Sequence, residues 1–175
     1  FKSVLNEVHA AYAQHDAGDI YISEPGLHPM DRRQFGICAV TTDGTVTEVG
    51  DAQADFLIQS VSKLFAYGLA LEDHGRDEVL KHVDVAPTGD RYDGIIKVQT
   101  GSKRPHNPMV NAGGIATTSL IKGTGKASRL NRVLEMYRRY IGHEVFVDMR
   151  AYLSEQASGD RNKAISYLLR NFGMI

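Results

Sequence analysis

Gln59-Ser60-Val61-Ser62-Lys63 follows an apolar run at residues 56–58 and opens a pattern of apolar residues at helical spacing. Residues three apart share one face of a helix, so the Ser60 hydroxyl and the Lys63 amine can touch. A serine hydroxyl is a weak nucleophile until a base lies within hydrogen-bond reach. A lysine can be that base only when it is neutral, which requires desolvation or a nearby positive charge. The stretch therefore predicts a helix that begins with a nucleophile and its base.

This Ser-x-x-Lys spacing is the acylation signature of β-lactamases and penicillin-binding proteins. At the first turn of a helix the serine N–H has no helical acceptor, so it can also help to hold an oxyanion. The same spacing arises by chance at exposed helix starts, which leaves a purely structural interpretation open. The surrounding sequence decides between the two interpretations.

The composition is that of an ordinary folded domain. The 175 residues are 42% hydrophobic and 23% charged, with a formal net charge of −1. This charge gives no electrostatic basis for binding nucleic acid or an anionic membrane. No apolar run approaches the roughly 18 residues that a membrane span needs. We therefore expect a cytoplasmic protein without a nucleic-acid or membrane partner.

A helix over residues 1–12 and two β-strands are expected ahead of the Ser-x-x-Lys stretch. Residues 35–40 are mostly apolar, residues 45–49 alternate, and Asp43-Gly44 between them is a strong hairpin signal because a tight turn there needs positive φ. Cys38 lies in the first strand and is expected to be a small buried core residue. Two strands are too few for a stable sheet, so further strands must come from elsewhere.

Most of the remaining sequence predicts helices, which gives the α+β class. Apolar residues repeat at helical spacing in residues 130–141 and 164–172. The second of these helices has Asp160 as its expected N-cap and Gly173 as its stop. Residues 87–114 are rich in Gly, Pro and Asn and predict a long loop.

Two other kinds of site find no support in the sequence. A phosphate-binding Walker loop needs a glycine five residues before its Gly-Lys pair, but Leu120 stands there relative to Gly125-Lys126, and Ala127 replaces the following Ser or Thr. The seven histidines show no zinc-binding spacing, and the single cysteine cannot complete such a site. We expect neither a metal nor a cofactor.

Two polar clusters further along the chain favour chemistry at Ser60. Residues 107–113 read Asn-Pro-Met-Val-Asn-Ala-Gly, and residues 154–162 read Ser-Glu-Gln-Ala-Ser-Gly-Asp-Arg-Asn. Taken singly, each cluster is explained by turns and helix caps. Together with residues 59–63, in this order and spacing, they resemble the serine-dependent glutaminase family, and the resemblance covers essentially the whole chain.

The resemblance implies hydrolysis of L-glutamine to L-glutamate and ammonia on a β-lactamase/DD-peptidase-like fold, without a metal. A helical lobe would sit against an α/β lobe, with residues 1–58 in the first part of the α/β lobe and residues 59–175 forming the nucleophile helix and the helical lobe. Family members run well beyond residue 175 and carry the remaining strands there, so the catalytic unit is expected to be incomplete at this end. A homo-oligomer, dimer or tetramer, is also implied.

The resemblance further implies a role for individual residues. Ser60 matches the acylated serine, and Lys63 matches the residue that activates it or shuttles its proton. Besides Ser60, four residues match positions that contact the substrate: Tyr21 at the entrance, Asn111, Glu155 and Asn162.

The chemistry of glutamine agrees with these roles. An acid suits the α-ammonium, and amide donors suit the α-carboxylate. Each such charged hydrogen bond is worth about 1.5–3 kcal/mol.

Two alternatives stay open. A penicillin-recognising serine hydrolase would share the Ser-x-x-Lys pair, but its Lys-Thr-Gly motif does not occur in the 175 residues. A non-catalytic fragment or partner subunit of a glutaminase would keep the fold and lack the activity. The family also commonly has alanine where this chain has Gly114, and Pro-Gln where it has Ser23-Glu24.

Overall fold

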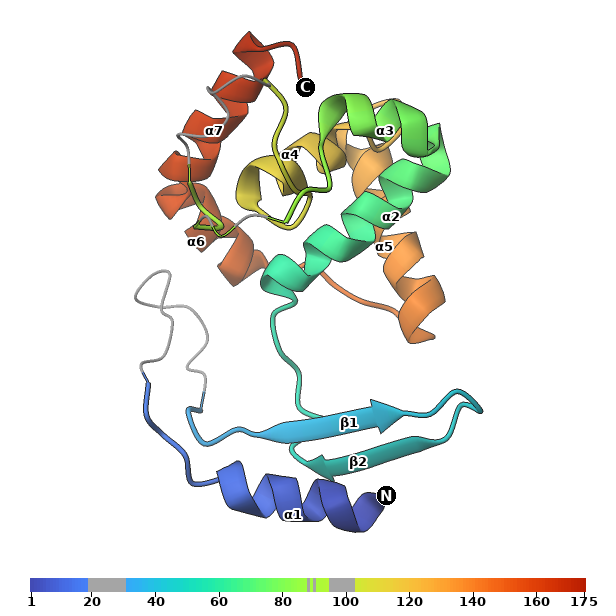
Figure 1. The fold of residues 1–175 in the computed structure, drawn as a ribbon, viewed down its shortest axis with the longest axis vertical. Coiled ribbons are helices and arrows are strands. Elements are labelled where there is room, and N and C mark those ends of the chain that lie inside the picture. Colours follow the sequence, from blue (N-terminus) through green and yellow to red (C-terminus); the bar gives the residue numbers. More distant parts are fainter. Residues whose placement is uncertain (19–30, 88, 90, 95–102) are drawn as a thin grey trace.

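The computed structural model describes residues 1–18, 31–87, 89, 91–94 and 103–175. It contains both helices and strands in two groups (Figure 1). An N-terminal helix and a β-hairpin form one group, and the remaining helices form the other. The chain passes from the hairpin to the helices through one connecting segment (Figure 1). No helix within the described ranges is long and apolar enough to cross a lipid bilayer.

The first group consists of α1 (Lys2–Tyr12), β1 (Gly36–Val40) and β2 (Val46–Gly50). The two strands are antiparallel, in register from the pair Gly36 and Gly50 to the pair Val40 and Val46. Gly44 in the connecting turn has φ +85°, a left-handed conformation that favours glycine. The predicted hairpin at Asp43-Gly44 is therefore confirmed, as is the N-terminal helix.

Helix α1 lies against one face of this hairpin. The His9 side chain makes a hydrogen bond of 3.0 Å to the Phe35 carbonyl, and the two rings stack with centroids 5.0 Å apart. Ile37 and Ala39 alternate with exposed neighbours in β1 and are half-buried. Cys38 points to the opposite face and is exposed, so the expectation of a buried cysteine was wrong. Side-chain burial along residues 35–40 therefore alternates with a period of two, as in a sheet that is covered on one face.

The second group contains the short 3-10 helix η1 and six α-helices among the described residues. Their bounds are η1 Gln59–Val61, α2 Ser62–His74, α3 Arg76–His82, α4 Asn111–Ser119, α5 Lys126–Ile141, α6 Met149–Ser158 and α7 Asp160–Asn171. Helices α2 and α4 lie near the middle of the group, with α3, α5 and α7 around them (Figure 1).

Small clusters of buried apolar side chains join these helices. One joins α2 to α5, a second joins α4 to α7, and a third joins α2 to α3 within the described residues. Their members are Leu69, Ile121, Met136 and Tyr137; Ala112, Ile165 and Leu169; and Ala70, Val79 and Val83, respectively. Helix α2 belongs to two of these clusters and α4 to one, so apolar packing ties each of these helices to at least one neighbour.

The prediction of a long loop over residues 87–114 was wrong for the last residues of that range. Helix α4 begins at Asn111, and Gly113 and Gly114 are buried within it. A Cβ on Gly113 would lie 1.9 Å from the Asn107 carbonyl oxygen. Gly113 therefore lets the helix lie against the backbone at Asn107, a tertiary gain that offsets the poor helix propensity of glycine.

The predicted end of the last helix is confirmed, and its predicted start is corrected. Gly173 follows α7 with φ +71°, as expected for a C-terminal stop. Asp160 is the first helical residue, and Gly159 takes the N-cap position without a side-chain cap. Gly159 is thus the only residue between α6 and α7, which places the polar cluster 154–162 across a tight corner.

Candidate active site

Ser60 and Lys63 meet at the start of α2. Lys63 Nζ donates a hydrogen bond of 2.9 Å to Ser60 Oγ, so the predicted contact between hydroxyl and amine is present. Ser60 lies in η1, immediately ahead of α2, and its side chain is exposed. The serine is therefore presented by a tight 3-10 turn, and the lysine by the first turn of the α-helix that follows.

The backbone is strained next to Ser60. Gln59 has φ +42°, the only positive φ of a non-glycine residue in the described part of the chain. For an L-residue this conformation costs about 1–2 kcal/mol. The Ser62 hydroxyl donates to the Gln59 carbonyl at 2.6 Å, and the Val61 N–H donates to the Ile58 carbonyl at 3.1 Å. These two hydrogen bonds hold the turn that carries Ser60.

The surroundings of Lys63 favour its neutral form. Its side chain is partly buried, and desolvation lowers the pKa of the amine below the ordinary lysine value. Among the described residues no carboxylate forms an ion pair with it, and its second contact is a neutral amide oxygen, Asn111 Oδ1, at 2.6 Å. Buried Gly114 lies beside the lysine stem, since a Cβ there would be 2.9 Å from Lys63 Cγ. Desolvation thus shifts the pKa of Lys63 in the direction that a general base needs.

Asn111 connects the lysine to a third helix. Its Oδ1 accepts from Lys63, and its Nδ2 donates to Asn162 Oδ1 at 3.0 Å. Asn111 is the first residue of α4, and Asn162 lies in the first turn of α7. A chain of hydrogen bonds therefore runs from Ser60 through Lys63 and Asn111 to Asn162, and brings together four residues that the sequence singled out.

Glu155, also predicted, is not part of this chain of hydrogen bonds. Glu155 lies on α6 with an exposed side chain, and within the described residues its carboxylate makes no hydrogen bond to Ser60, Lys63 or the asparagines. Tyr21 lies outside the described residues. No group of three or more His, Cys, Asp or Glu side chains in the described ranges is arranged to hold a metal ion.

Sequence reasoning missed the segment that supports Asn111 and Asn162. The Asn111 N–H donates to the Tyr92 carbonyl at 2.8 Å. Next to it, the buried carboxylate of Asp93 accepts from Arg161 at 2.5 Å. An aspartate between Tyr and Gly in a polar loop suggests a turn, so no pattern distinguished Asp93 from its neighbours.

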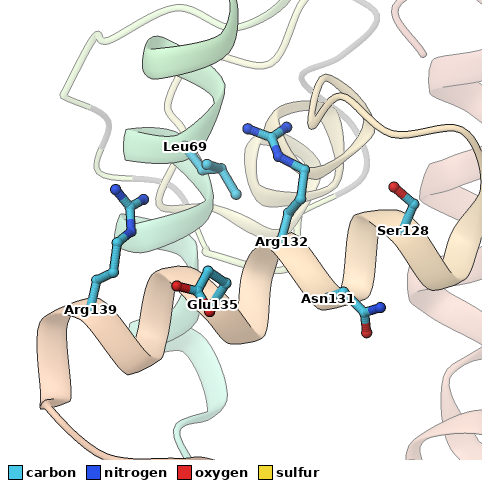
Figure 2. A pocket seen from close by; sticks show the side chains of 6 residues that line it. All are labelled: Leu69, Ser128, Asn131, Arg132, Glu135 and Arg139. Atoms are coloured by element: carbon cyan, nitrogen blue, oxygen red, sulfur yellow. The ribbon is translucent and has the colours of Figure 1, made fainter.

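An open groove of about 500 Å³ between α2 and α5 lies apart from this site. Figure 2 shows its lining: Leu69, Ser128, Asn131, Arg132, Glu135 and Arg139. Arg132 donates to both oxygens of Asp73, at 2.5 and 2.6 Å, and Arg139 lies 3.4 Å from Glu72. The cations of the groove are thus paired with acids of α2, and they brace the two helices.

Known proteins resemble this chain along its length. A family model described as Glutaminase matches residues 18–175. A glutaminase of Trichormus variabilis is 56% identical over 173 residues, covering 99% of this chain and 52% of that protein. A glutaminase of Microcystis aeruginosa is 47% identical over 175 residues, covering 100% of this chain and 52% of that protein. The chain spans about half the length of the curated relatives it matches.

Solved structures that resemble this chain also include glutaminases. A Bacillus glutaminase crystallised with 4.3 M NaCl superposes with a TM-score of 0.87 at 28% identity, covering 99% of this chain and 55% of that one. A probable glutaminase, ybaS, gives a TM-score of 0.94 at 30% identity, covering 99% and 56%. The mixed helices and strands described above are therefore those of glutaminase structures. With the family model matched over residues 18–175, this chain belongs to the glutaminase family.

Proposed function

We propose that the protein hydrolyses L-glutamine to L-glutamate and ammonia through an acyl-enzyme on Ser60. The observation that carries the proposal is the 2.9 Å contact between Ser60 Oγ and Lys63 Nζ, an amine whose pKa is lowered by desolvation. Membership of the glutaminase family supports the choice of substrate. The same family supports a β-lactamase-like arrangement of lobes, with residues 1–58 in one and 59–175 in the other.

In the first half-reaction, Ser60 Oγ attacks the side-chain amide carbon of glutamine while neutral Lys63 takes the hydroxyl proton. The lysine becomes an ammonium, and Asn111 Oδ1, 2.6 Å away, accepts a hydrogen bond from it. Lys63 then gives a proton to the amide nitrogen as the carbon–nitrogen bond breaks. Ammonia leaves, and the glutamyl group stays on Ser60 as an ester.

In the second half-reaction, water attacks the ester carbon and Lys63 takes a proton from it. The ester bond breaks, the proton returns to Ser60 Oγ, and glutamate leaves. The lysine acts as base and then as acid in each half, which requires a pKa near the working pH. Lowering by desolvation moves the amine in that direction.

The remaining residues are proposed to hold the amino acid end of the substrate. Asn162 Oδ1 is occupied by Asn111, which leaves the Asn162 amide hydrogens for the α-carboxylate. Glu155 is proposed to bind the α-ammonium, since its carboxylate is exposed on the helix that precedes α7. Tyr21 is proposed to line the entrance. L-Glutamine is the partner of this site, and homo-oligomer formation stays a prediction.

The test is direct detection of the acyl-enzyme. The full-length protein is mixed with L-glutamine, quenched in acid within the first turnovers, digested, and analysed by mass spectrometry. A glutamyl group on the peptide that contains Ser60, together with ammonia release, supports the proposal. Ammonia release with no modified peptide under any quench time would refute the covalent route. Labelling by benzylpenicillin without ammonia release from glutamine would favour the penicillin-recognising alternative.

A further inference from the structure

The turn at residues 91–94 contains a buried acid. The Asp93 side chain is 12% exposed, and it accepts hydrogen bonds from Arg91 and from Arg161. Oδ1 accepts from Arg91 Nε at 3.0 Å, and Oδ2 accepts from Arg91 Nη2 at 3.3 Å and from Arg161 Nη1 at 2.5 Å. Hydrogen bonds from Arg91 foremost, with the charge of Arg161, hold the pKa of Asp93 below its ordinary value. The carboxylate is therefore ionised and has guanidinium donors on both oxygens.

The ion pair between Asp93 and Arg161 connects the turn to the candidate active site. Arg161 lies in the first turn of α7, next to Asn162. A cation in the first turn of a helix is opposed by the helix dipole, so this arginine gains from an anion placed beside it. The ion pair with Arg91 stays within the turn, so it does not link the turn to α7.

The same turn also holds Asn111. The Tyr92 carbonyl accepts from the Asn111 N–H at 2.8 Å, and the turn is closed by a hydrogen bond of 3.1 Å from the Gly94 N–H to the Arg91 carbonyl. One short segment thus contacts the first turns of both α4 and α7. These are the helices that present Asn111 and Asn162, whose side chains are 3.0 Å apart.

We infer that Asp93 is a positioning residue that holds Asn162 in place for the substrate carboxylate by fixing Arg161 at the start of α7. The inference rests on the proposed glutaminase function and adds a determinant of substrate affinity. Asp93 does not itself contact Ser60 or Lys63 within the described structure, and it acts through α7.

The variant Asp93→Asn tests this inference with little change of shape. An amide in place of the carboxylate turns one acceptor oxygen into an NH₂ donor, which faces a guanidinium donor whichever way the amide is oriented. We expect KM for L-glutamine to rise about tenfold, the scale of one charged hydrogen bond. We expect kcat to stay within about twofold, because Ser60 and Lys63 keep their contact.

A second substrate separates positioning from general weakening of the fold. The derivative of L-glutamine with its α-carboxylate converted to a carboxamide lacks the charge that Asn162 is proposed to bind. If Asp93 acts through Asn162, the change Asp93→Asn should raise KM for this carboxamide derivative by much less than it raises KM for L-glutamine. An equal rise for both substrates would assign Asp93 a structural role only and overturn the inference.

The chain provides a matched control and a double-variant cycle. Asp160→Asn makes the same charge change in the first turn of α7, beside Arg161, but Asp160 is exposed and pairs with Lys163, so KM should stay near the wild-type value. Arg161→Gln should resemble Asp93→Asn, and the double variant should be no worse than the more affected single variant. Additive losses would mean that the two residues act independently, against the inference.

A crystal structure of the Asp93→Asn protein separates this inference from the proposed function. Loss of the Asn111–Asn162 hydrogen bond, 3.0 Å in the wild type, would support positioning even if the wild-type protein released no ammonia from glutamine. Retention of that hydrogen bond with Arg161 unmoved would overturn it. Failure of the wild-type protein to hydrolyse glutamine would count against the proposed function alone.

Discussion

Replacing Asn111 with Asp should move the pH dependence of the reaction. The two side chains have nearly the same shape, and the oxygen that faces Lys63 at 2.6 Å is retained. The change places a negative charge beside an amine that, among the described residues, has no carboxylate in ion-pair contact. An adjacent anion favours the protonated lysine, and a protonated lysine cannot take the Ser60 proton.

The magnitude follows from that distance. An opposite charge within about 4–6 Å favours the charged form of its partner by about 10- to 1000-fold. Lys63 is partly buried, so solvent screens this attraction only in part. At a pH below the pKa of Lys63, kcat/KM should therefore fall by about 10- to 1000-fold. The rise of activity with pH should move to higher pH, because the raised pKa keeps the lysine charged over a wider range.

The assay is steady-state ammonia release from L-glutamine, measured from acid to alkaline pH for the wild type and the variant. Asn162→Asp is the matched control, since it introduces the same charge one step further along the chain of hydrogen bonds, at a residue that does not contact Lys63. It should raise KM, because an anion would face the proposed position of the substrate carboxylate, and should leave the pH profile of kcat nearly unchanged.

Two outcomes would count against this reasoning. If Asn111→Asp lowers activity by the same factor at every pH, the Lys63 charge is not what limits the rate, and another group takes the Ser60 proton. Equal movement of the profile in Asn162→Asp would show that the effect is not specific to the contact with Lys63.

The remaining predictions concern the nucleophile, the substrate ammonium and the fold. Ser60→Ala should lower kcat by about 10⁴–10⁶, and a variant that keeps a tenth of the ammonia release would exclude an acyl-enzyme at this residue. Glu155→Gln should raise KM for L-glutamine about 10- to 100-fold by removing one charged hydrogen bond, with a smaller rise for a substrate without the α-amino group; equal rises would make Glu155 structural. Asp73→Ala should lower the free energy of unfolding by about 1–3 kcal/mol in urea titrations, since it leaves the partly exposed Arg132 and the Lys122 N–H without their acceptor; a change below about 0.5 kcal/mol would mean that the brace is not needed. Because Arg132 lowers the pKa of Asp73, this stability should be present above the ordinary value of 3.8 and be lost as the pH falls below it.

The parts of the fold that could be predicted depend on residues close in sequence. Asp43-Gly44 specifies a tight turn, and the turn fixes the strands on either side. Ser60 and Lys63 are three residues apart, so helical geometry alone brings their side chains together. In both cases the interacting residues are only a few positions apart, so the local sequence is enough to predict the contact.

The parts that could not be predicted depend on packing between distant segments. Asn111 is 48 residues from Lys63 and 51 from Asn162, and their contacts exist only because α4 lies between α2 and α7. Gly113 and Gly114 argue against a helix on propensity, yet both are buried within α4, and a Cβ on Gly113 would collide with the Asn107 carbonyl. Local sequence patterns do not report contacts between distant segments, so the family resemblance was needed to group Asn111 and Asn162 with Ser60.

The left-handed backbone of Gln59 has a consequence for engineering this protein. Glycine would adopt φ +42° without the penalty of about 1–2 kcal/mol that an L-residue incurs. Its larger loss of backbone entropy on folding would offset roughly 0.5–1 kcal/mol of this gain in stability. Selection for thermal tolerance alone would thus favour glycine at this position, or be indifferent. Selection for turnover would oppose glycine if the wider conformational range of a glycine before Ser60 loosens the contact between the hydroxyl and Lys63. Libraries screened only by melting temperature would therefore not remove glycine at residue 59, even if it lowers turnover.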